Sequence, residues 1–348
     1  MSLAQPQSPR LPDRACLLLA SFLILAAAAG RAAFLLLDCP LDLAPDEAHY
    51  WDWSRHPDWS YYSKGPLVAW IIGASCWLLG DLSVSLTGNL MFAIRAPALL
   101  FGAGLLFSVY ALAVQASRSH RLALAVVAVL LSHPAIAAGS SLMTIDSPYT
   151  CLWAVALTLA LRAVRTDERW AWLLCGAVVA LGILAKYTMA LFLPSLALYL
   201  LFSPQRRDLL ARPGPWLLVA VSALACVPIL LWNASHGWVT FLHVFHIAGG
   251  EREGFKWFGP LAFLGGQALV MLGVWLAFWL CAVVAYRPWA DGDEGRAYLW
   301  WMSVPTFALF LAASAKKGSG EINWPIACYL SGAVLAAIWA ASCWERGG

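Results

Sequence analysis

The sequence predicts an all-α, polytopic membrane protein of about ten transmembrane helices. Of its 348 residues, 61% are apolar and only 12% are charged, whereas a soluble domain carries roughly 25% charged residues. Apolar runs extend from Ala15 to Trp344 without a long polar interval, so we expect one membrane-embedded domain over residues 1–348. The same composition excludes a disordered chain. A net charge of +3 gives no general basic surface for nucleic acid.

Ten apolar runs approach the roughly 20 residues that a helix needs to cross a bilayer. They cover residues 15–37, 92–116, 121–138, 147–164, 170–185, 187–202, 216–232, 258–285, 298–313 and 325–343. Lys and Arg are enriched in the short loops that stay on the cytoplasmic side. If the N-terminus is inside and these runs are the spans, 13 of the 22 basic residues lie in cytoplasmic segments.

A shorter apolar run at residues 66–80 follows the first outer loop, which we place at residues 38–65. If this run crossed the membrane, the later arginine-rich loops would move to the outside, against the usual bias. We therefore expect 66–80 to form an interfacial or re-entrant helix near the outer surface. All five lysines then fall at or near that face, against the usual bias: Lys64, Lys186, Lys256, Lys316 and Lys317. Either an anionic ligand outside attracts them, or the outer loops simply tolerate a few lysines.

The first outer loop is the densest stretch of reactive groups, with six carboxylates and six aromatic residues. Asp46 and Glu47 open a predicted short helix that ends at Trp53, where a helix N-terminus favours negative charge. They are either capping acids or reactive carboxylates. Lys64 closes the loop, so the acids and this lysine would face one outer pocket. The aromatic residues are typical both of an interfacial belt and of a sugar site.

Further charged groups occur at predicted outer ends of spans, namely Arg95, Asp146 and Lys186. Ionisable residues near the hydrocarbon are costly and usually mark a site, although each of these side chains can also extend to the headgroups. Glu321 lies in the loop before the last span. No metal site is predicted, because the histidines and the nine cysteines lack ligand spacing.

Seven short motifs then point to a family. They are PDEAHY at 45–50, YYSKGPL at 61–67, RAP at 95–97, TIDSP at 144–148, GILAKY at 182–187, LWNASHGW at 231–238 and GEINWP at 320–325. In this order, over nearly the whole chain, they resemble the bacterial relatives of the protein O-mannosyltransferases and of the lipid A aminoarabinose transferase, within the glycosyltransferase C superfamily. Two details differ: Gly65 stands where relatives often have proline, and His49 stands where the lipid A enzymes have arginine.

The resemblance implies an inverting glycosyltransferase at the non-cytoplasmic face of a bacterial inner membrane. Its donor would be a polyprenyl-phosphate sugar, and its acceptor a hydroxyl group on a lipid, glycan or protein. In that family the acid matching Asp46 is regarded as the catalytic carboxylate, and the lysine matching Lys64 as a ligand of the lipid phosphate.

Chemical reasoning extends this set of residues. A departing phosphate is stabilised by positive charge, which Arg95 and Lys186 would add to that of Lys64. Glu47 and Asp146 would assist Asp46 by positioning the acceptor or the sugar. The predicted substrate contacts are His49, Tyr50, Tyr61, Tyr62 and Glu321.

No cofactor is required by this reaction, and a divalent metal ion has too few acidic ligands to be supported. The alternative function is a transporter or flippase for a lipid-linked or anionic substrate, in which the same charges would be coupling groups. A non-catalytic scaffold is a third reading. The absence of a convincing internal repeat, and the gathering of charges at one face, favour the transferase.

Overall fold

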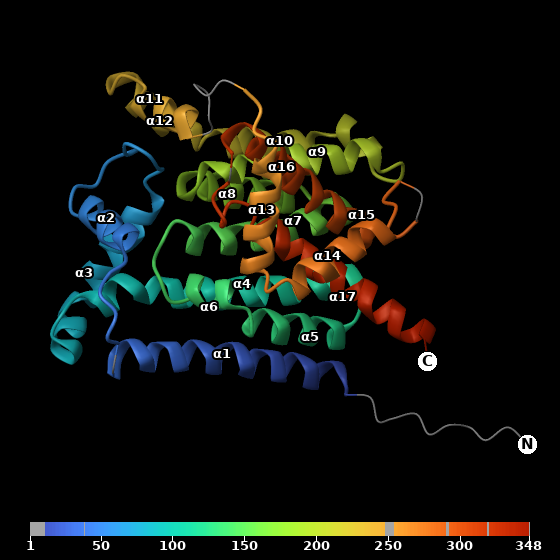
Figure 1. Ribbon diagram of the computed structural model, residues 1–348, viewed down its shortest axis with the longest axis horizontal. Coiled ribbons are helices and arrows are strands. Elements are labelled where there is room, and N and C mark those ends of the chain that lie inside the picture. Colours follow the sequence, from blue (N-terminus) through green and yellow to red (C-terminus); the bar gives the residue numbers. More distant parts are fainter. Residues whose placement is uncertain (1–10, 38, 248–253, 290–291, 319, 348) are drawn as a thin grey trace, which may run out of the picture.

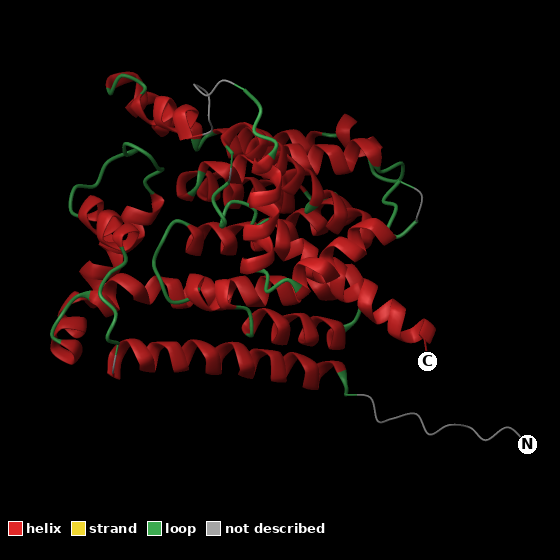
Figure 2. Ribbon diagram, in the orientation of Figure 1, coloured by secondary structure: helices red, strands yellow, loops and turns green. Residues whose placement is uncertain are grey.

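The computed structural model describes residues 11–37, 39–247, 254–289, 292–318 and 320–347, and these ranges contain helices and loops but no strand (Figures 1 and 2). The predicted all-α class is therefore confirmed. Asp38, which opens the predicted outer loop, lies outside the described residues. The helices are α1 (Asp13–Leu37), α2 (Pro45–Ser54), α3 (Leu67–Thr87), α4 (Met91–Ser117), α5 (His120–Leu131), α6 (Pro134–Gly139), α7 (Asp146–Thr166), α8 (Arg169–Ala185), η1 (Tyr187–Leu191), α9 (Phe192–Phe202), η2 (Arg207–Ala211), α10 (Pro213–Ala223), α11 (Cys226–Ser235), α12 (Val239–Ile247), α13 (Phe258–Val270), α14 (Val274–Ala285), α15 (Glu294–Trp301), α16 (Val304–Lys317) and α17 (Cys328–Gly347).

Seven helical segments in the described chain are long and apolar enough to cross a membrane. They are α1, α3, α4, α7, the pair α10–α11, the pair α15–α16, and α17. An eighth is possible if α13 and α14, which meet at 116°, form one broken span. Three shorter apolar helices add to these. The protein is an integral membrane protein, and the count of ten spans stays a prediction.

The long helices lie side by side along one axis (Figure 1). α2 and α3 lie at one end of this bundle, on the left of the figure, which we call the α2 end; α1 begins and α17 finishes at the opposite end. α7 is the central helix, with 72% of its apolar window buried against its neighbours. Its alanines 154, 156 and 160 are fully buried, and such small residues let neighbouring helices approach closely.

α3 is longer than the predicted 66–80 segment, because it continues to Thr87. Its Ser75 hydroxyl donates to the carbonyl oxygen of Ala93 at 2.6 Å, and the Ser83 hydroxyl accepts from the Ala93 amide at 3.2 Å. Both serines thus hold α3 against the first turns of α4. Although α3 is long enough to span a membrane, these contacts place it at the α2 end. Its location at a membrane interface stays a prediction.

Gly65 allows the start of α3 to approach the end of α8. A Cβ atom at this position would overlap the carbonyl oxygen of Leu184. This close backbone contact explains why a residue without a side chain stands here. Lys64 is next to Gly65 in the chain, and Lys186 lies two residues after Leu184. The contact between Gly65 and Leu184 therefore also brings the two lysines near each other.

We expect Gly65→Ala to lower the free energy of unfolding by about 1–3 kcal/mol, because a backbone carbonyl cannot move aside as a flexible side chain does. Chemical unfolding of the purified protein in detergent measures this loss. Gly139→Ala is the control, since a Cβ at Gly139 meets nothing within 4 Å. Equal stabilities of the two variants would show that the contact with α8 is not tight.

Candidate active site

Charged side chains from four separate segments gather at the α2 end of the bundle. Asp146, the first residue of α7, accepts a hydrogen bond from Lys186 Nζ at 2.6 Å through Oδ1. Its other oxygen, Oδ2, accepts from Asn323 Nδ2 at 2.7 Å. Lys64 and Asp46 complete the group, which we call the charged cluster, since both act electrostatically on their neighbours within it. Residues 46, 64, 146, 186 and 323 are therefore brought together only by folding.

Lys64 is the cation of the charged cluster that lacks a partner. Among the described residues, its ammonium group forms no hydrogen bond or ion pair. Burial lowers the pKa of Lys64, and the positive charge of Lys186 lowers it further, against the opposite effect of the nearby carboxylates. A bound anion would relieve both the repulsion and the lack of solvation. The geometry around Lys64 thus suits an anionic group.

Asp46 is the open carboxylate of the charged cluster. It lies exposed in the first turn of α2, and its side chain forms no hydrogen bond or ion pair with another described residue. Tyr50, one turn later, is buried; burial raises its pKa, and the charges of Asp46 and Asp146 raise it further. Tyr50 therefore keeps its proton beside these two acids. Asp46 is available to accept a proton from a substrate.

Glu47, in contrast, is fully enclosed by protein donors. Both it and Arg95 are buried, with 0% and 1% of their surfaces exposed. Arg95 Nη2 lies 2.8 Å from Glu47 Oε2, and the backbone amides of Ala44 and Met143 donate to the two Glu47 oxygens at 3.0 and 2.9 Å. This ion pair joins α2, α4 and the loop before α7. Its carboxylate has no free side for a substrate.

The rest of the Arg95 guanidinium is also occupied. Its Nη1 and Nη2 donate to the carbonyl oxygens of Leu41 and Asp42 at 3.0 and 2.7 Å. The structure therefore does not bring Arg95 into the charged cluster as the predicted phosphate ligand, because its donors are used to hold the loop after α1.

The predicted aromatic contacts divide into buried and exposed groups. The Tyr61 hydroxyl donates to the carbonyl oxygens of Trp53 and His56, both at 3.1 Å, and its ring stacks on Trp53 at 4.4 Å. Tyr61 thus supports the loop. Tyr62 is 54% exposed and lies 4.6 Å from the ring of His243. His49 is exposed against Trp53, so the surfaces open to a ligand are those of His49 and Tyr62.

Comparisons with known proteins find similar membrane glycosyltransferases. Residues 63–232 match the family model described as dolichyl-phosphate-mannose-protein mannosyltransferase. The chain is 28% identical over 303 residues to the lipid A galacturonosyltransferase RgtD of Rhizobium johnstonii, covering 86% of this chain and 60% of that protein. It is 27% identical over 320 residues to the undecaprenyl phosphate-alpha-4-amino-4-deoxy-L-arabinose arabinosyl transferase of Pectobacterium carotovorum, covering 85% and 54%.

Solved structures of membrane glycosyltransferases have a similar fold. The crystal structure of ArnT from Cupriavidus metallidurans bound to undecaprenyl phosphate superposes with a TM-score of 0.70 at 19% identity, over 91% of this chain and 59% of that one. The apo oligosaccharyltransferase of Archaeoglobus fulgidus superposes with a TM-score of 0.61 at 13% identity, over 94% and 51%. These similarities support the resemblance to the glycosyltransferase C superfamily that the sequence motifs indicate. It spans just over half the length of these relatives.

Two residues at this site are not predicted from the sequence. Asn323 lies within the GEINWP motif, but an amide carries no charge and a search for ionisable groups passes over it. Asp58 Oδ2 accepts from Trp232 Nε1 at 2.7 Å and so joins the first loop to α11. Nothing in the sequence distinguishes Asp58 from the other five acids of the first outer loop. Glu321, a predicted substrate contact, is exposed. Its Oε1 lies 2.8 Å from Lys317 Nζ.

The described residues include no group of three His, Cys, Asp or Glu side chains placed to hold a metal ion.

Removing the charge of Arg95 should be far more damaging than removing that of an exposed arginine nearby. In Arg95→Met, Glu47 remains buried without its cation, and we expect the free energy of unfolding to fall by about 3–5 kcal/mol. Arg55→Met is the control, because Arg55 pairs with Asp52 on the exposed side of α2; its loss should be within about 1 kcal/mol. Denaturant titration of both variants compares the losses, and similar losses would contradict the structural role of the pair.

Proposed function

We propose that the protein is an inverting glycosyltransferase that transfers a sugar from a polyprenyl-phosphate donor to an acceptor hydroxyl group. The observation that carries this proposal is the unpartnered Lys64 beside the Lys186–Asp146 pair and the open Asp46, at one end of a membrane bundle. The relatives support it, since their names specify lipid A and undecaprenyl phosphate. We further propose that acceptors belong to the lipid, glycan or protein class.

Lys64 and Lys186 would bind the donor phosphate. The leaving group is a phosphate ester, which departs as an anion and needs no general acid. Two fixed ammonium groups stabilise the charge that develops as the bond between the anomeric carbon and the phosphate oxygen breaks. Asp146 orients Lys186 through one oxygen, while Asn323 fixes the other oxygen. Such preorganisation lowers the cost of reaching the reactive geometry.

Asp46 would act as the general base. The acceptor oxygen forms a bond with the anomeric carbon as the phosphate leaves, and the hydroxyl proton moves to the Asp46 carboxylate. A base in hydrogen-bond reach contributes typically 10²–10⁴-fold to such a step. The single displacement inverts the anomeric carbon. Its products are the glycosylated acceptor and free polyprenyl phosphate.

The other predicted site residues then take different roles. Glu47 and Arg95 are positioning residues, because their ion pair anchors the first turn of α2 and so holds the adjacent Asp46 in place. Tyr61 likewise supports the loop. His49, Tyr62 and Glu321 stay proposed substrate contacts, since they are exposed and flank the charged cluster. Tyr50 is buried and so would support the charged cluster from behind.

The charged cluster would face the non-cytoplasmic side of a bacterial inner membrane. Arg118, Arg165 and Arg207 lie at the opposite end of the bundle, where α4, α7 and α9 finish. Basic residues in short loops are retained in the cytoplasm. This bias supports an orientation in which a lipid-linked donor meets Lys64 from outside.

Asp46→Asn should lower the rate of transfer by at least about 10²-fold, because the amide cannot take the proton. Release of polyprenyl phosphate from a panel of polyprenyl-phosphate sugars, with membrane extract as acceptor, measures the rate in reconstituted bilayers. The control is Asp52→Asn, on the same helix but paired with Arg55. Equal rates in wild type and Asp46→Asn would remove Asp46 from the reaction. Movement of lipid without release by wild type would support a transporter.

The lowered pKa of Lys64 predicts a specific pH dependence. An ammonium group binds phosphate only while protonated, so donor affinity should fall as pH rises through a pKa below the ordinary lysine value of about 10.4. In Lys64→Arg this fall should move to higher pH, because arginine stays charged. Lys64→Ala should bind the donor weakly at every pH. Donor binding measured from pH 7 to 10 tests this, and an unchanged affinity in Lys64→Ala would exclude the phosphate role.

A further inference from the structure

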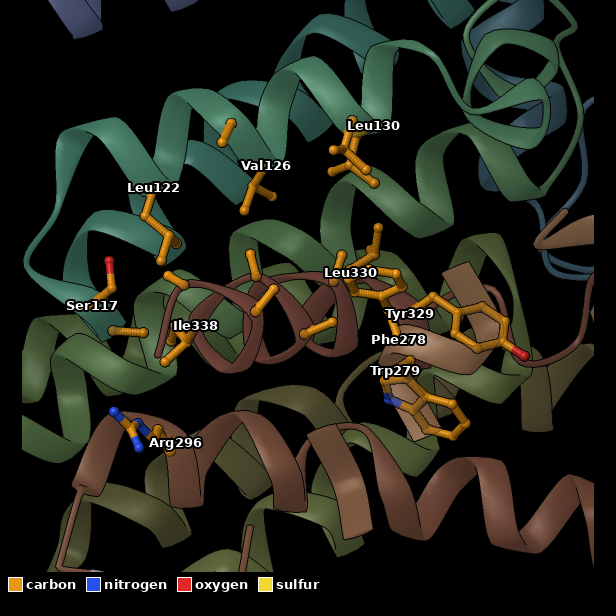
Figure 3. Close-up of a pocket in the computed structure, with 18 of the residues that line it drawn as sticks. Ser117, Leu122, Val126, Leu130, Phe278, Trp279, Arg296, Tyr329, Leu330 and Ile338 are labelled. Carbon is orange, nitrogen blue, oxygen red and sulfur yellow. The ribbon is translucent and has the colours of Figure 1, made fainter. Parts of the chain in front are cut away.

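A large cavity lies along the helices at the other side of the molecule from α2 and α3. It has a volume of ≈ 1370 Å³, which exceeds the roughly 300–1,000 Å³ of a small-molecule pocket. α5 forms one wall and α17 the other, and the two helices run past each other on either side of it (Figure 3). We call this space the α5–α17 groove.

The sides of α5 and α17 that face the α5–α17 groove are mainly apolar. α5 contributes Leu122, Val126 and Leu130, one from each successive turn, and α17 contributes Leu330 and Ile338 (Figure 3). Between these two, α17 lines the groove with the alanines at 333, 336 and 337. Because alanine has only a methyl group, this stretch leaves room where larger residues would close the space. The interior therefore suits hydrocarbon chains.

The length of α5 matches one leaflet of a bilayer. α5 has 12 residues, which at 1.5 Å per residue gives a wall of about 18 Å. Half of a bilayer core is about 15 Å thick. A lipid of a single leaflet can thus lie along α5 with its headgroup at one mouth.

The mouth at the opposite end from α2 is basic. Arg118, which follows α4, is exposed, and its side chain forms no ion pair or hydrogen bond with another described residue. Arg121 at the start of α5 donates only to the carbonyl oxygen of Leu11, at 2.9 and 3.1 Å. Both arginines line the groove.

Most of the acids at this mouth are already matched. Asp293 pairs with Arg296 at 3.2 Å, and Arg296 lies at this end of the groove in Figure 3. Glu294 pairs with Arg165 and Arg206. Glu345 at the end of α17 is the remaining acid that lines it. The lining therefore has a net positive charge next to an apolar channel.

We propose that the α5–α17 groove binds an anionic glycerophospholipid, with its acyl chains along α5 and α17 and its phosphate at Arg118 and Arg121. Basic pockets between transmembrane helices on the cytoplasmic side bind anionic headgroups, and the arginine-rich end is the cytoplasmic one in the orientation proposed above. This site is separate from the charged cluster at the α2 end. It does not depend on the transferase activity.

Binding of two lipids that differ only in headgroup tests the site. The purified full chain is titrated with phosphatidylglycerol or phosphatidylcholine of equal chain length, and bound lipid is counted by native mass spectrometry. Wild type should prefer phosphatidylglycerol. In the double variant Arg118→Gln/Arg121→Gln we expect phosphatidylglycerol to bind about 10- to 30-fold more weakly, because each basic residue near the headgroup strengthens binding by about fivefold.

The matched control is Arg169→Gln/Arg207→Gln. These arginines lie at the same end of the bundle, are exposed and do not line the groove, so their loss should leave lipid binding unchanged. Ala333→Trp fills the groove and should weaken both lipids alike. A thermal unfolding transition like that of wild type serves as the check that each variant is folded.

Equal binding of phosphatidylglycerol by wild type and Arg118→Gln/Arg121→Gln would overturn the proposal. So would displacement of polyprenyl phosphate, rather than phospholipid, by Ala333→Trp, because the groove would then hold the chain of the donor. Either result leaves the transferase proposal intact, since that depends on the release assay with Asp46→Asn.

Discussion

The buried ion pair between Glu47 and Arg95 is the interaction on which the α2 end of the molecule depends. A charged pair without exposed surface is stable only if every donor and acceptor is matched. Here two backbone amides complete the carboxylate and two backbone carbonyls complete the guanidinium. Through these contacts the loop after α1, helices α2 and α4, and the loop before α7 are held in one arrangement. The first outer loop is consequently a structured element.

The charged cluster is built on this support and differs from it in one respect. Glu47 and Arg95 satisfy each other, whereas Lys64 and Asp46 have no partner among the described residues. The positive charges of Lys64 and Lys186 repel each other. An anion bound between them would attract both and so offset this repulsion. Residues whose charges are paired within the protein shape the site, whereas residues whose charges are unpaired would contact a substrate.

The two ends of the bundle use charge in different ways. At the α2 end, lysines and acids occur within loops that also present Trp and Tyr side chains, and the proposed ligand is a lipid phosphate carrying a sugar. At the opposite end, arginines match acids in pairs and leave Arg118 and Arg121 beside an apolar groove. Arginine stays charged in all environments and binds phosphate in a fixed geometry, which fits a permanent lipid contact. Lysine changes its pKa readily, which fits a site that binds and releases a substrate.

The sequence by itself determined the all-α membrane class, because apolar runs and the scarcity of charge are properties of composition. It also indicated that Asp46, Lys64, Asp146 and Lys186 lie at the same face, since the ends of successive spans alternate between the two sides. Only the tertiary structure decided which of the charged residues satisfy one another. Glu47 and Asp46 are adjacent in the chain and identical in kind, yet one is enclosed and the other open. Packing around the helix decides this, because neighbouring positions on a helix point about 100° apart.

The role of Asn323 depended on folding for the same reason. It lies 177 positions from Asp146, and nothing in the order of residues indicates which acid an uncharged amide will contact. The α5–α17 groove likewise needs three-dimensional structure, because alanines on α17 leave a cavity only when the helix opposite them does not fill it. Composition and spacing thus indicate which segments are helical and which ends face polar surroundings. The pairing of side chains across helices follows from how those helices pack, which local sequence does not contain.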